Sequence, residues 1–231
     1  MSEIGAGGGS IATVNQMGIV QVGPESASAD PGPICYRQGG NRSTVTDADL
    51  TLGYLNPANF AGGTMLLDDT GAANGIERDI GMPQGRTTLQ AAWTVHDVIN
   101  ETMAAAVRMH VTERGGNPEA ATMIAFGGAG PVHAYNLARK LHIQKLIVPL
   151  RAGVLSALGL LVAPPAYDVV RTYKAPIRTL NADDITGQMD AMAMEIKMLL
   201  DGIEEPGARR FRRALDVGSV SYTHLTLTTK A

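Results

Sequence analysis

Residues 122–149 read TMIAFGGAGPVHAYNLARKLHIQKLIVP, and this stretch decides the fold. An apolar run at residues 122–126 predicts a buried strand, a glycine-rich turn follows it, and an amphipathic run at residues 132–141 predicts a helix. A second apolar run at residues 146–149 predicts another strand. Strand, helix and strand with short connections form a βαβ unit, so we expect two parallel strands and an α/β fold.

The glycine-rich turn contains Gly127, Gly128 and Gly130 and lies at the carboxyl end of the first predicted strand. Ligands of open α/β sheets bind at that edge. Glycines let a backbone approach a ligand closely, and the N-terminus of the following helix offers unpaired N–H groups to an anion or a polar edge. The turn is therefore typical of a ligand site, without specifying the ligand.

The composition is that of a globular chain. Its 231 residues are 45% hydrophobic and 18% charged, enough for one sizeable core in one domain or two small ones. A formal net charge of −3 argues against nucleic acid or an anionic membrane as the partner, and the longest apolar segment, residues 153–165, is too short to span a bilayer. The single cysteine, Cys35, favours a cytoplasmic location and is more typical of a small buried apolar residue than of a nucleophile.

A second glycine-rich stretch, residues 5–10, leads directly into an apolar run at residues 11–14. Another apolar run follows at residues 19–22, and the four-residue connection between them predicts a β-hairpin. A loop that leads into a strand is not a dinucleotide fingerprint, which must open a helix. The loop is either a backbone nest for a phosphate or ordinary turn material, and spacing alone leaves both open.

Three aspartates follow the hairpin. Asp30 lies in a loop over residues 24–40, and loops of that length are usually functional or disordered. If the segment with Asp47 and Asp49 is extended, both carboxylates point to one face and could share a cation or do acid–base work. If it starts a helix, the two carboxylates only stabilise the helix dipole, and the residues themselves favour this second interpretation.

Helical periodicity predicts helices at residues 87–111, at residues 153–162 and over residues 185–203, the last capped by Asn181. Residues 71–86 are polar and glycine-rich, which predicts a surface excursion. His96 and His110 share the first of these helices but lie several turns apart. They are too distant to share a metal through one helix, so we interpret both as structural.

Five stretches stand in a characteristic order. They are EIGAGGGSIA at residues 3–12, VGPESA with ADPGP and CY over residues 22–36, TVTDA at residues 44–48, FGGAGP at residues 126–131 and VLSALGLL at residues 154–161. Together they resemble the hydantoinase A/5-oxoprolinase family, which also includes the ATP-dependent acetone carboxylase β subunit. The resemblance covers residues 1–217, which we expect to be the C-terminal part of one catalytic domain.

The resemblance implies a partial actin-like ATPase lobe of the ribonuclease H-like type, with a βαβ unit and an N-terminal β-hairpin. It also implies an enzyme that uses ATP and Mg²⁺ to phosphorylate and open a cyclic amide such as hydantoin or 5-oxoproline. A hydantoinase B-type subunit or domain is the implied partner, in an oligomer of the full-length parent. One alternative is an acetone carboxylase-type β subunit, and another is a non-catalytic nucleotide-binding or assembly module.

The resemblance also suggests site residues, by motif position. Those expected near the phosphates of ATP are Gly5, Gly7, Gly8, Gly9 and Ser10, and those expected beside the adenosine are Gly127, Gly128 and Gly130. Asp30 and Asp47 match acidic positions and are the predicted catalytic carboxylates, with a role toward substrate or metal. The metal ligand is unknown, because the Asp-Ile-Gly-Gly-Thr-Ser segment whose aspartate should hold Mg²⁺ is absent from the chain. We therefore expect a fragment that is inactive alone.

Several positions depart from the family pattern. Ser28 and Arg37 stand where glycine is usual, and each costs on the order of 1 kcal/mol if the loop needs a positive φ there. Asp49 stands where asparagine is common. Residues 218–231 include VSYTHLTL, which resembles a translated sequencing adapter, so we expect a non-native tail from metagenomic assembly.

Overall fold

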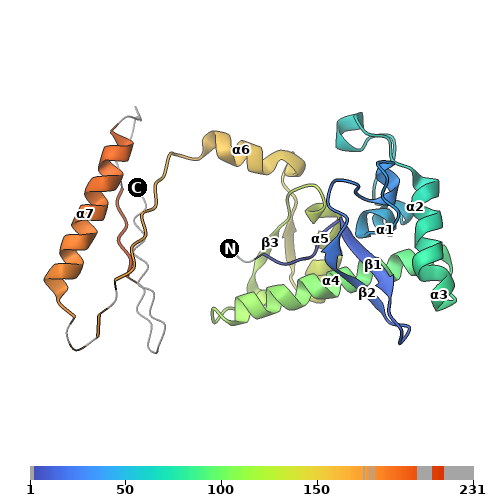
Figure 1. Cartoon of the computed structure of the whole chain (residues 1–231), viewed down its shortest axis with the longest axis horizontal. Coiled ribbons are helices and arrows are strands. Elements are labelled where there is room, and N and C mark those ends of the chain that lie inside the picture. The colour runs from blue at the N-terminus through green and yellow to red at the C-terminus, as the bar shows by residue number, and fades with distance from the viewer. Residues whose placement is uncertain (1–2, 174, 177, 179, 202–209, 216–231) are drawn as a thin grey trace. The chain divides into compact units, whose positions relative to one another are not determined.

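The computed structural model describes residues 3–173, 175–176, 178, 180–201 and 210–215 (Figure 1). Contacts divide the chain into two compact units, Met1–Gly159 and Leu160–Ala231. Each unit is described by itself. The predicted tail at residues 218–231 lies outside the described residues.

The first unit begins with the predicted β-hairpin, which is confirmed. Strands β1 (Ser10–Val14) and β2 (Val20–Ser26) pair antiparallel, with Val14 opposite Val20. The Asn15 side chain shapes the connection, because its Oδ1 accepts the N–H groups of Met17 and Ile19 at 3.0 and 2.9 Å.

Helices α1 (Val45–Thr51) and α4 (Thr88–Thr112) pack with this hairpin around the main core. The long helix predicted over residues 87–111 is confirmed, and Thr87 caps it through a capping box with Gln90. The core is formed by apolar side chains from these elements and from the helical region at residues 69–81: Ala12, Val20, Val45, Ala48, Ile76, Ile80, Ala91, Ala92, Val95 and Ile99. It supports β1 and α1, the elements next to the first glycine-rich turn.

The prediction of a surface excursion at residues 71–86 is wrong. Helix α2 (Asp69–Ile76), a π-helical segment (Glu77–Gly81) and helix α3 (Met82–Gln84) occupy this region, and Ile76 is fully buried. A Cβ at Gly75 would lie 2.4 Å from Ile34 Cδ1, so glycine there allows close packing. Tertiary packing thus decides this segment against its low local helix propensity.

The βαβ unit is confirmed in the same unit, but the prediction that its first strand is buried is wrong, because Thr122 and Ile124 are exposed. Strands β3 (Thr122–Ile124) and β4 (Lys145–Ile147) are parallel, and helix α5 (Gly130–Lys140) joins them and packs on α4. The fold class predicted from the sequence, α/β with an N-terminal hairpin and a βαβ unit, is therefore confirmed.

Short 3-10 segments punctuate the connections at Ile34–Tyr36, Ala61–Gly63, Pro118–Ala120 and Ala152–Val154. Ser28 and Arg37 both adopt φ of 57°, so the positions where glycine was expected do require the left-handed region. Helix α6 (Leu155–Val162) forms as predicted.

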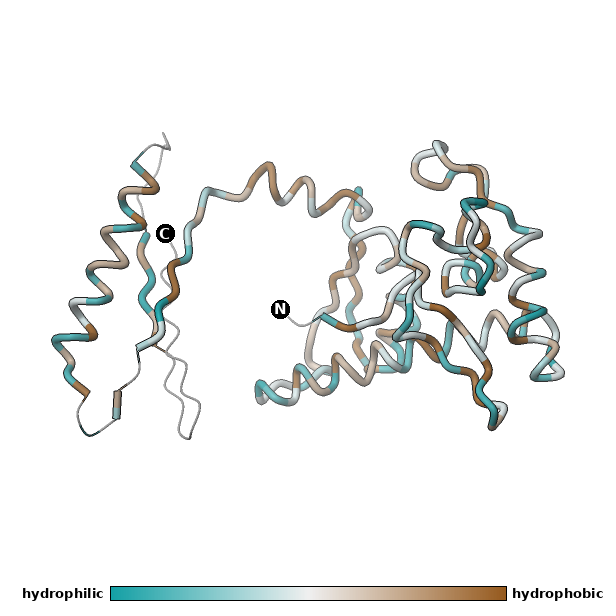
Figure 2. The backbone as a smooth tube through the Cα atoms, in the orientation of Figure 1, coloured by the Kyte–Doolittle hydropathy of each residue, from teal (hydrophilic) through white to brown (hydrophobic). Residues whose placement is uncertain are grey.

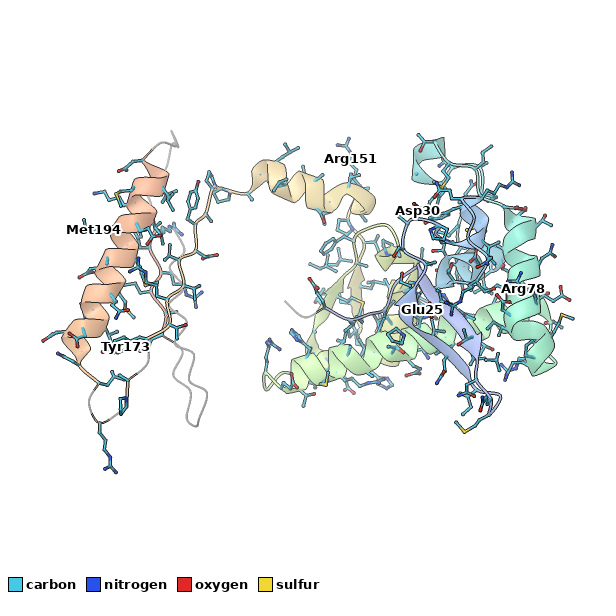
Figure 3. All side chains as sticks on the ribbon, in the orientation of Figure 1. Glu25, Asp30, Arg78, Arg151, Tyr173 and Met194 are labelled. Atoms are coloured by element: carbon cyan, nitrogen blue, oxygen red, sulfur yellow. The ribbon has the colours of Figure 1, made fainter. Side chains whose placement is uncertain are left out.

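Helix α7 (Ala182–Leu200) lies in the second unit and is also confirmed, with Asn181 Oδ1 accepting the N–H of Asp183 at 3.0 Å. Its hydropathy alternates along the tube in Figure 2, and Met192 and Ile196 are buried while Met194, labelled in Figure 3, is 67% exposed. None of the helices in the described ranges combines the length and the apolar character that a membrane span requires.

Candidate functional site

The first glycine-rich turn packs against helix α1. The Gly8 carbonyl accepts the N–H of Thr46 at 2.8 Å, and the Gly7 N–H donates to Ser10 Oγ at 3.1 Å. A Cβ at Gly8 would lie 2.6 Å from Thr46 Oγ1, and one at Gly9 would lie 2.9 Å from Ser26 Oγ. Close approach to neighbouring side chains therefore explains glycine at positions 8 and 9.

The same turn also has an open side. A Cβ at Gly7 would meet no atom within 4 Å. Within the described part of the chain, the backbone N–H groups of Gly8 and Gly9 have no hydrogen-bond acceptor. Unpaired N–H groups of a turn can hold an anion, so the turn has the chemistry of a phosphate nest.

The glycines of the second glycine-rich turn face open space, and the Gly127 N–H donates to the Ala152 carbonyl at 2.9 Å. Gly127 has φ of +93°, and a Cβ at Gly127, Gly128 or Gly130 would meet nothing within 4 Å. An apolar cavity of about 360 Å³ adjoins this turn and includes Phe126 and Gly130 in its lining. The turn therefore offers bare backbone next to an apolar hollow.

Asp47 is fully buried at the start of α1. Its carboxylate accepts the N–H and hydroxyl of Thr44 at 2.9 and 2.8 Å, and the N–H groups of Ile34 and Cys35 at 3.2 and 2.8 Å. These contacts form a capping box and fasten the residue 24–40 loop to α1. Capping of α1 and anchoring of the loop account for these contacts of the carboxylate, and a catalytic role for Asp47 stays a prediction.

Asp30 has a different environment, because it lies exposed in the loop after β2 (Figure 3). The two predicted catalytic carboxylates, exposed Asp30 and buried Asp47, therefore lie in different environments. Cys35 is buried, and burial, followed by the Asp47 charge, raises the pKa of its thiol. The thiol therefore stays protonated, which confirms the interpretation of Cys35 as a packing residue.

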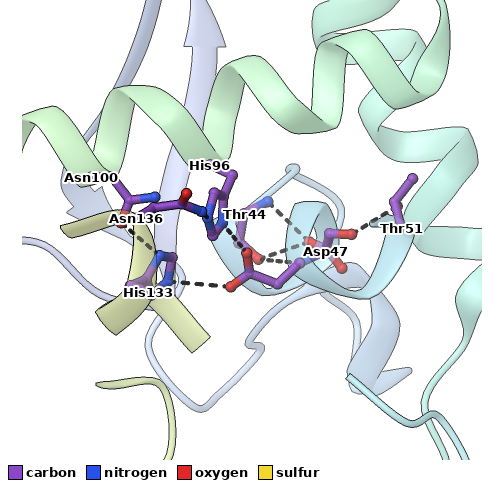
Figure 4. Close-up of polar contacts among 8 residues, drawn as sticks. Thr44, Asp47, Thr51, His96, Asn100, His133 and Asn136 are labelled. Carbon is purple, nitrogen blue, oxygen red and sulfur yellow. Dashed lines mark hydrogen bonds and ion pairs between the residues drawn. The ribbon is translucent and has the colours of Figure 1, made fainter. Parts of the chain in front are cut away.

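A buried cluster of three side chains is the feature that the sequence did not predict. Asp49 Oδ1 lies 2.7 Å from His96 Nδ1, and Asp49 Oδ2 lies 3.3 Å from His133 Nε2 (Figure 4). All three side chains are at most 4% exposed. The two imidazole rings stack with centroids 4.7 Å apart. We call Asp49, His96 and His133 the buried triad.

Two asparagines flank the buried triad. Asn136 Nδ2 lies 3.1 Å from His96 Nε2, and Asn100 Oδ1 lies 3.2 Å from His133 Nδ1. Burial acts to raise the pKa of Asp49, but hydrogen bonds and charge from His133 and His96 outweigh it and lower that pKa. Asp49 is therefore an anion at neutral pH and lies in contact with both imidazoles.

The buried triad connects the two glycine-rich turns. Asp49 lies on α1, whose first turn bonds to Gly8, and His133 lies on α5, which begins at the second turn. His96 lies on α4 between these helices. Asp47 and Asp49 therefore contact different side chains and backbone groups. The extended arrangement that would point both carboxylates to one face is wrong, because the segment is helical.

Sequence reasoning considered only His96 and His110 as a pair, and these do not meet. His110 instead lies beside Arg114, with His110 Nδ1 2.9 Å from the Arg114 guanidinium. Two signals could have pointed to the buried triad: aspartate at position 49 where asparagine is common, and a histidine one turn after the second glycine-rich turn.

Among known sequences, the chain matches a family model and several individual proteins. A family model for hydantoinase/oxoprolinase matches residues 1–169. The acetophenone carboxylase gamma subunit of Aromatoleum aromaticum is 37% identical over 222 residues, which are 95% of this chain and 30% of that protein. Subunit alpha of caprolactamase from Pseudomonas jessenii is 38% identical over 172 residues, which are 74% of this chain and 25% of that protein. The chain thus spans less than a third of these relatives.

Two of the matching solved structures illustrate the shared fold. The crystal structure of ATP-dependent caprolactamase from Pseudomonas jessenii superposes with a TM-score of 0.72 at 31% identity, covering 97% of this chain and 33% of that one. The nucleotide-free structure of acetone carboxylase gives 0.68 at 23% identity, covering 98% of this chain and 39% of that one, and supports the fold alone. With the family model matching most of its length, the chain belongs to the hydantoinase/oxoprolinase family.

Proposed function

We propose that this chain supplies the nucleotide-facing turns of an ATP-dependent enzyme that phosphorylates a cyclic amide, such as a hydantoin or 5-oxoproline, and opens its ring with water. One observation carries the proposal: two glycine-rich turns with open backbone are joined through the buried triad. The name of the ATP-dependent caprolactamase supports both the nucleotide and the amide.

Phosphoryl transfer depends mainly on positioning and on neutralising charge. The unpaired N–H groups of Gly8 and Gly9 suit the phosphates, with Gly5, Gly7 and Ser10 completing their turn. The second turn, with Gly127, Gly128 and Gly130, and its adjoining apolar cavity suit the adenosine. Mg²⁺ would supply further positive charge at the phosphates.

The two predicted carboxylates enter the proposal differently. Asp30 is exposed and free to face a substrate or Mg²⁺ from its loop, since carboxylate oxygen is a ligand that Mg²⁺ prefers. Asp47 holds that loop in place through the N–H groups of Ile34 and Cys35. Asp47 would therefore act on the reaction by positioning the loop.

We also propose that the enzyme works in the cytoplasm with a hydantoinase B-type subunit or domain, in an oligomer. The matched relatives named as subunits, acetophenone carboxylase gamma and caprolactamase alpha, support a multi-subunit assembly. The chain would be one segment of the larger subunit and inactive by itself.

Carboxylation of a ketone is the second candidate, favoured by the match to the acetophenone carboxylase gamma subunit over 95% of this chain. Both reactions use ATP to activate a carbonyl oxygen, so the two turns described here serve either one. The substrate must therefore decide between them.

The test uses a protein of the relatives' length that contains these 231 residues, together with its B-type partner. Phosphate release is measured with ATP, Mg²⁺ and either 5-oxoproline, N-methylhydantoin and caprolactam, or acetone and acetophenone with bicarbonate. ATP-dependent turnover of a cyclic amide is expected. Turnover of ketones alone would favour the carboxylase, and calorimetric binding of Mg–ATP without any turnover would favour a non-catalytic nucleotide-binding module.

Two variants link the activity to the second turn. Gly128→Val places a side chain on its open face and should lower turnover at least about tenfold, equivalent to about 1.4 kcal/mol. Gly187→Ala, also in open space but on α7, should leave turnover unchanged. Unchanged turnover in Gly128→Val would remove the second turn from the site.

A further inference from the structure

The buried triad contains a nitrogen atom without a hydrogen-bond partner. In the amide orientation of the structure, Asn100 Oδ1 faces His133 Nδ1 at 3.2 Å and can only accept, which places the hydrogen of His133 on Nδ1. His133 Nε2 then presents a lone pair toward Asp49 Oδ2, 3.3 Å away, and has no hydrogen-bond partner among the described residues. A lone pair buried against a carboxylate oxygen is repulsive unless a positive charge lies between them.

The donor atoms lie close enough together to share one ion. One donor atom each from Asp49, His96 and His133 lies within 4.8 Å of the other two. Asp49 Oδ1 lies 2.7 Å from His96 Nδ1, and Asp49 Oδ2 lies 3.3 Å from His133 Nε2. Zinc binds imidazole nitrogen and carboxylate oxygen at about 2.0–2.2 Å, so adjacent ligands stand about 3.3 Å apart.

The donor set also selects the type of ion. Two imidazole nitrogens and one carboxylate oxygen suit Zn²⁺ and similar transition metals, whereas Mg²⁺ and Ca²⁺ take mostly oxygen ligands. Each imidazole has an asparagine amide at its second nitrogen, Asn136 for His96 and Asn100 for His133. Such outer contacts are what orient metal-binding histidines.

We propose that Asp49, His96 and His133 bind one divalent transition-metal ion of the Zn²⁺ type. The ion ties α1, α4 and α5 together and thereby fixes the spacing of the two glycine-rich turns. As it binds, the proton on His96 Nδ1 moves to Nε2 and the Asn136 amide turns its oxygen to accept it. This site is separate from any Mg²⁺ that accompanies ATP and does not depend on the proposed reaction.

The test measures metal uptake by the 231-residue chain. The chain is unfolded with a chelator, refolded with Zn²⁺ or Co²⁺, and measured by native mass spectrometry and by the visible absorption of bound Co²⁺. About one ion per chain is expected for the unaltered chain. Asp49→Asn and His133→Gln should lose it, whereas His110→Gln, which changes a histidine outside the buried triad, should keep it.

Three results would overturn the proposal: no uptake by the unaltered chain, equal uptake by Asp49→Asn, or loss of uptake in His110→Gln.

Without a metal, rotation of the Asn100 amide would let His133 donate Nε2–H to Asp49, and a proton would take the place of the ion.

A second measurement covers the case in which Asp49→Asn fails to fold. Zn²⁺, but not Mg²⁺, should raise the Tm of the unaltered chain. Asn136→Ala keeps all three ligands but removes the outer contact of His96, and it should weaken metal affinity about tenfold. A Tm that does not respond to Zn²⁺, or an unchanged affinity in Asn136→Ala, would contradict the site.

Discussion

The two glycine-rich turns have similar compositions but different packing. In the first, Gly8 and Gly9 stand where a Cβ would come within 3 Å of Thr46 and Ser26 side-chain oxygens. In the second, a Cβ on any of its glycines would meet empty space. A glycine motif therefore has two physical explanations, internal close packing and access for a ligand, and the sequence does not separate them.

The buried triad links the two turns through its side-chain contacts. It joins the helix beside the first turn to the helix that begins at the second. Changes to the buried triad should affect both turns, and changes within each turn should expose how the two differ.

The largest effect is expected for Asp49→Ala, because it leaves two buried imidazoles without their shared anion. In metal-free buffer at pH 7, urea unfolding of the chain should show a loss of about 3 kcal/mol. Asp97→Ala removes a 2.7 Å contact to Lys140 from a carboxylate that is 43% exposed, and should cost less than about 0.5 kcal/mol. Equal effects of the two substitutions would mean that the buried triad does not join the turns.

Gly8→Ala should follow, with a loss of about 2 kcal/mol in the same unfolding measurement, because its Cβ would overlap Thr46 Oγ1. Gly7→Ala, one residue earlier in the same turn, has open space and should be nearly neutral. Adding Thr46→Ala to Gly8→Ala should restore part of the loss. If the double variant shows simple additivity, the overlap with Thr46 is not the reason for glycine at position 8.

Asp47→Asn should cost about 1.5 kcal/mol, because an amide cannot accept from Thr44, Ile34 and Cys35 together and leaves a buried N–H unpaired. Asp30→Asn, in the exposed part of the same loop, should change stability by less than about 0.5 kcal/mol. Full activity of Asp47→Asn at a temperature where it stays folded would remove Asp47 from the list of catalytic residues.

Much of the fold could be predicted, because the relevant signals are local. Two apolar runs with a four-residue connection predicted the hairpin, and helical spacing of apolar residues predicted α4 and α7. The failure at residues 71–86 has a clear cause, since Gly75 and Ile76 are helical through contacts with residues far away in sequence. Local helix propensity does not include those long-range contacts.

The candidate site was only partly predictable. Both turns were identified from their glycines, but the buried triad draws one residue from each of three helices. A search for metal ligands along one helix could pair His96 only with His110. Nothing in spacing reveals that α5 places His133 on the ring of His96, because that contact depends on how α4 and α5 pack.

Ser28→Gly tests the backbone beside the first turn, where a Cβ on Gly9 would lie 3.4 Å from the Ser28 carbonyl oxygen. Ser28 has φ of 57°, so glycine should relieve strain and, after the entropy it adds to the unfolded chain, stabilise by about 0.5 kcal/mol. Ser28→Ala keeps the Cβ and should give no gain. Equal results for both would place the effect in the side chain.

The smallest effect, and the one that most sharpens the comparison, is expected for Gly128→Ala. Gly128 has no positive φ and no atom within 4 Å of a Cβ, so unfolding free energy should change by less than about 0.3 kcal/mol. Gly8→Ala and Gly128→Ala then form a pair with the same chemical change and opposite settings. If Gly128→Ala instead lowered the free energy of unfolding by more than about 1 kcal/mol, close packing would explain the glycine at position 128 as well. Its open face would then no longer point to a ligand, and the nucleotide would have to be sought at the first turn alone.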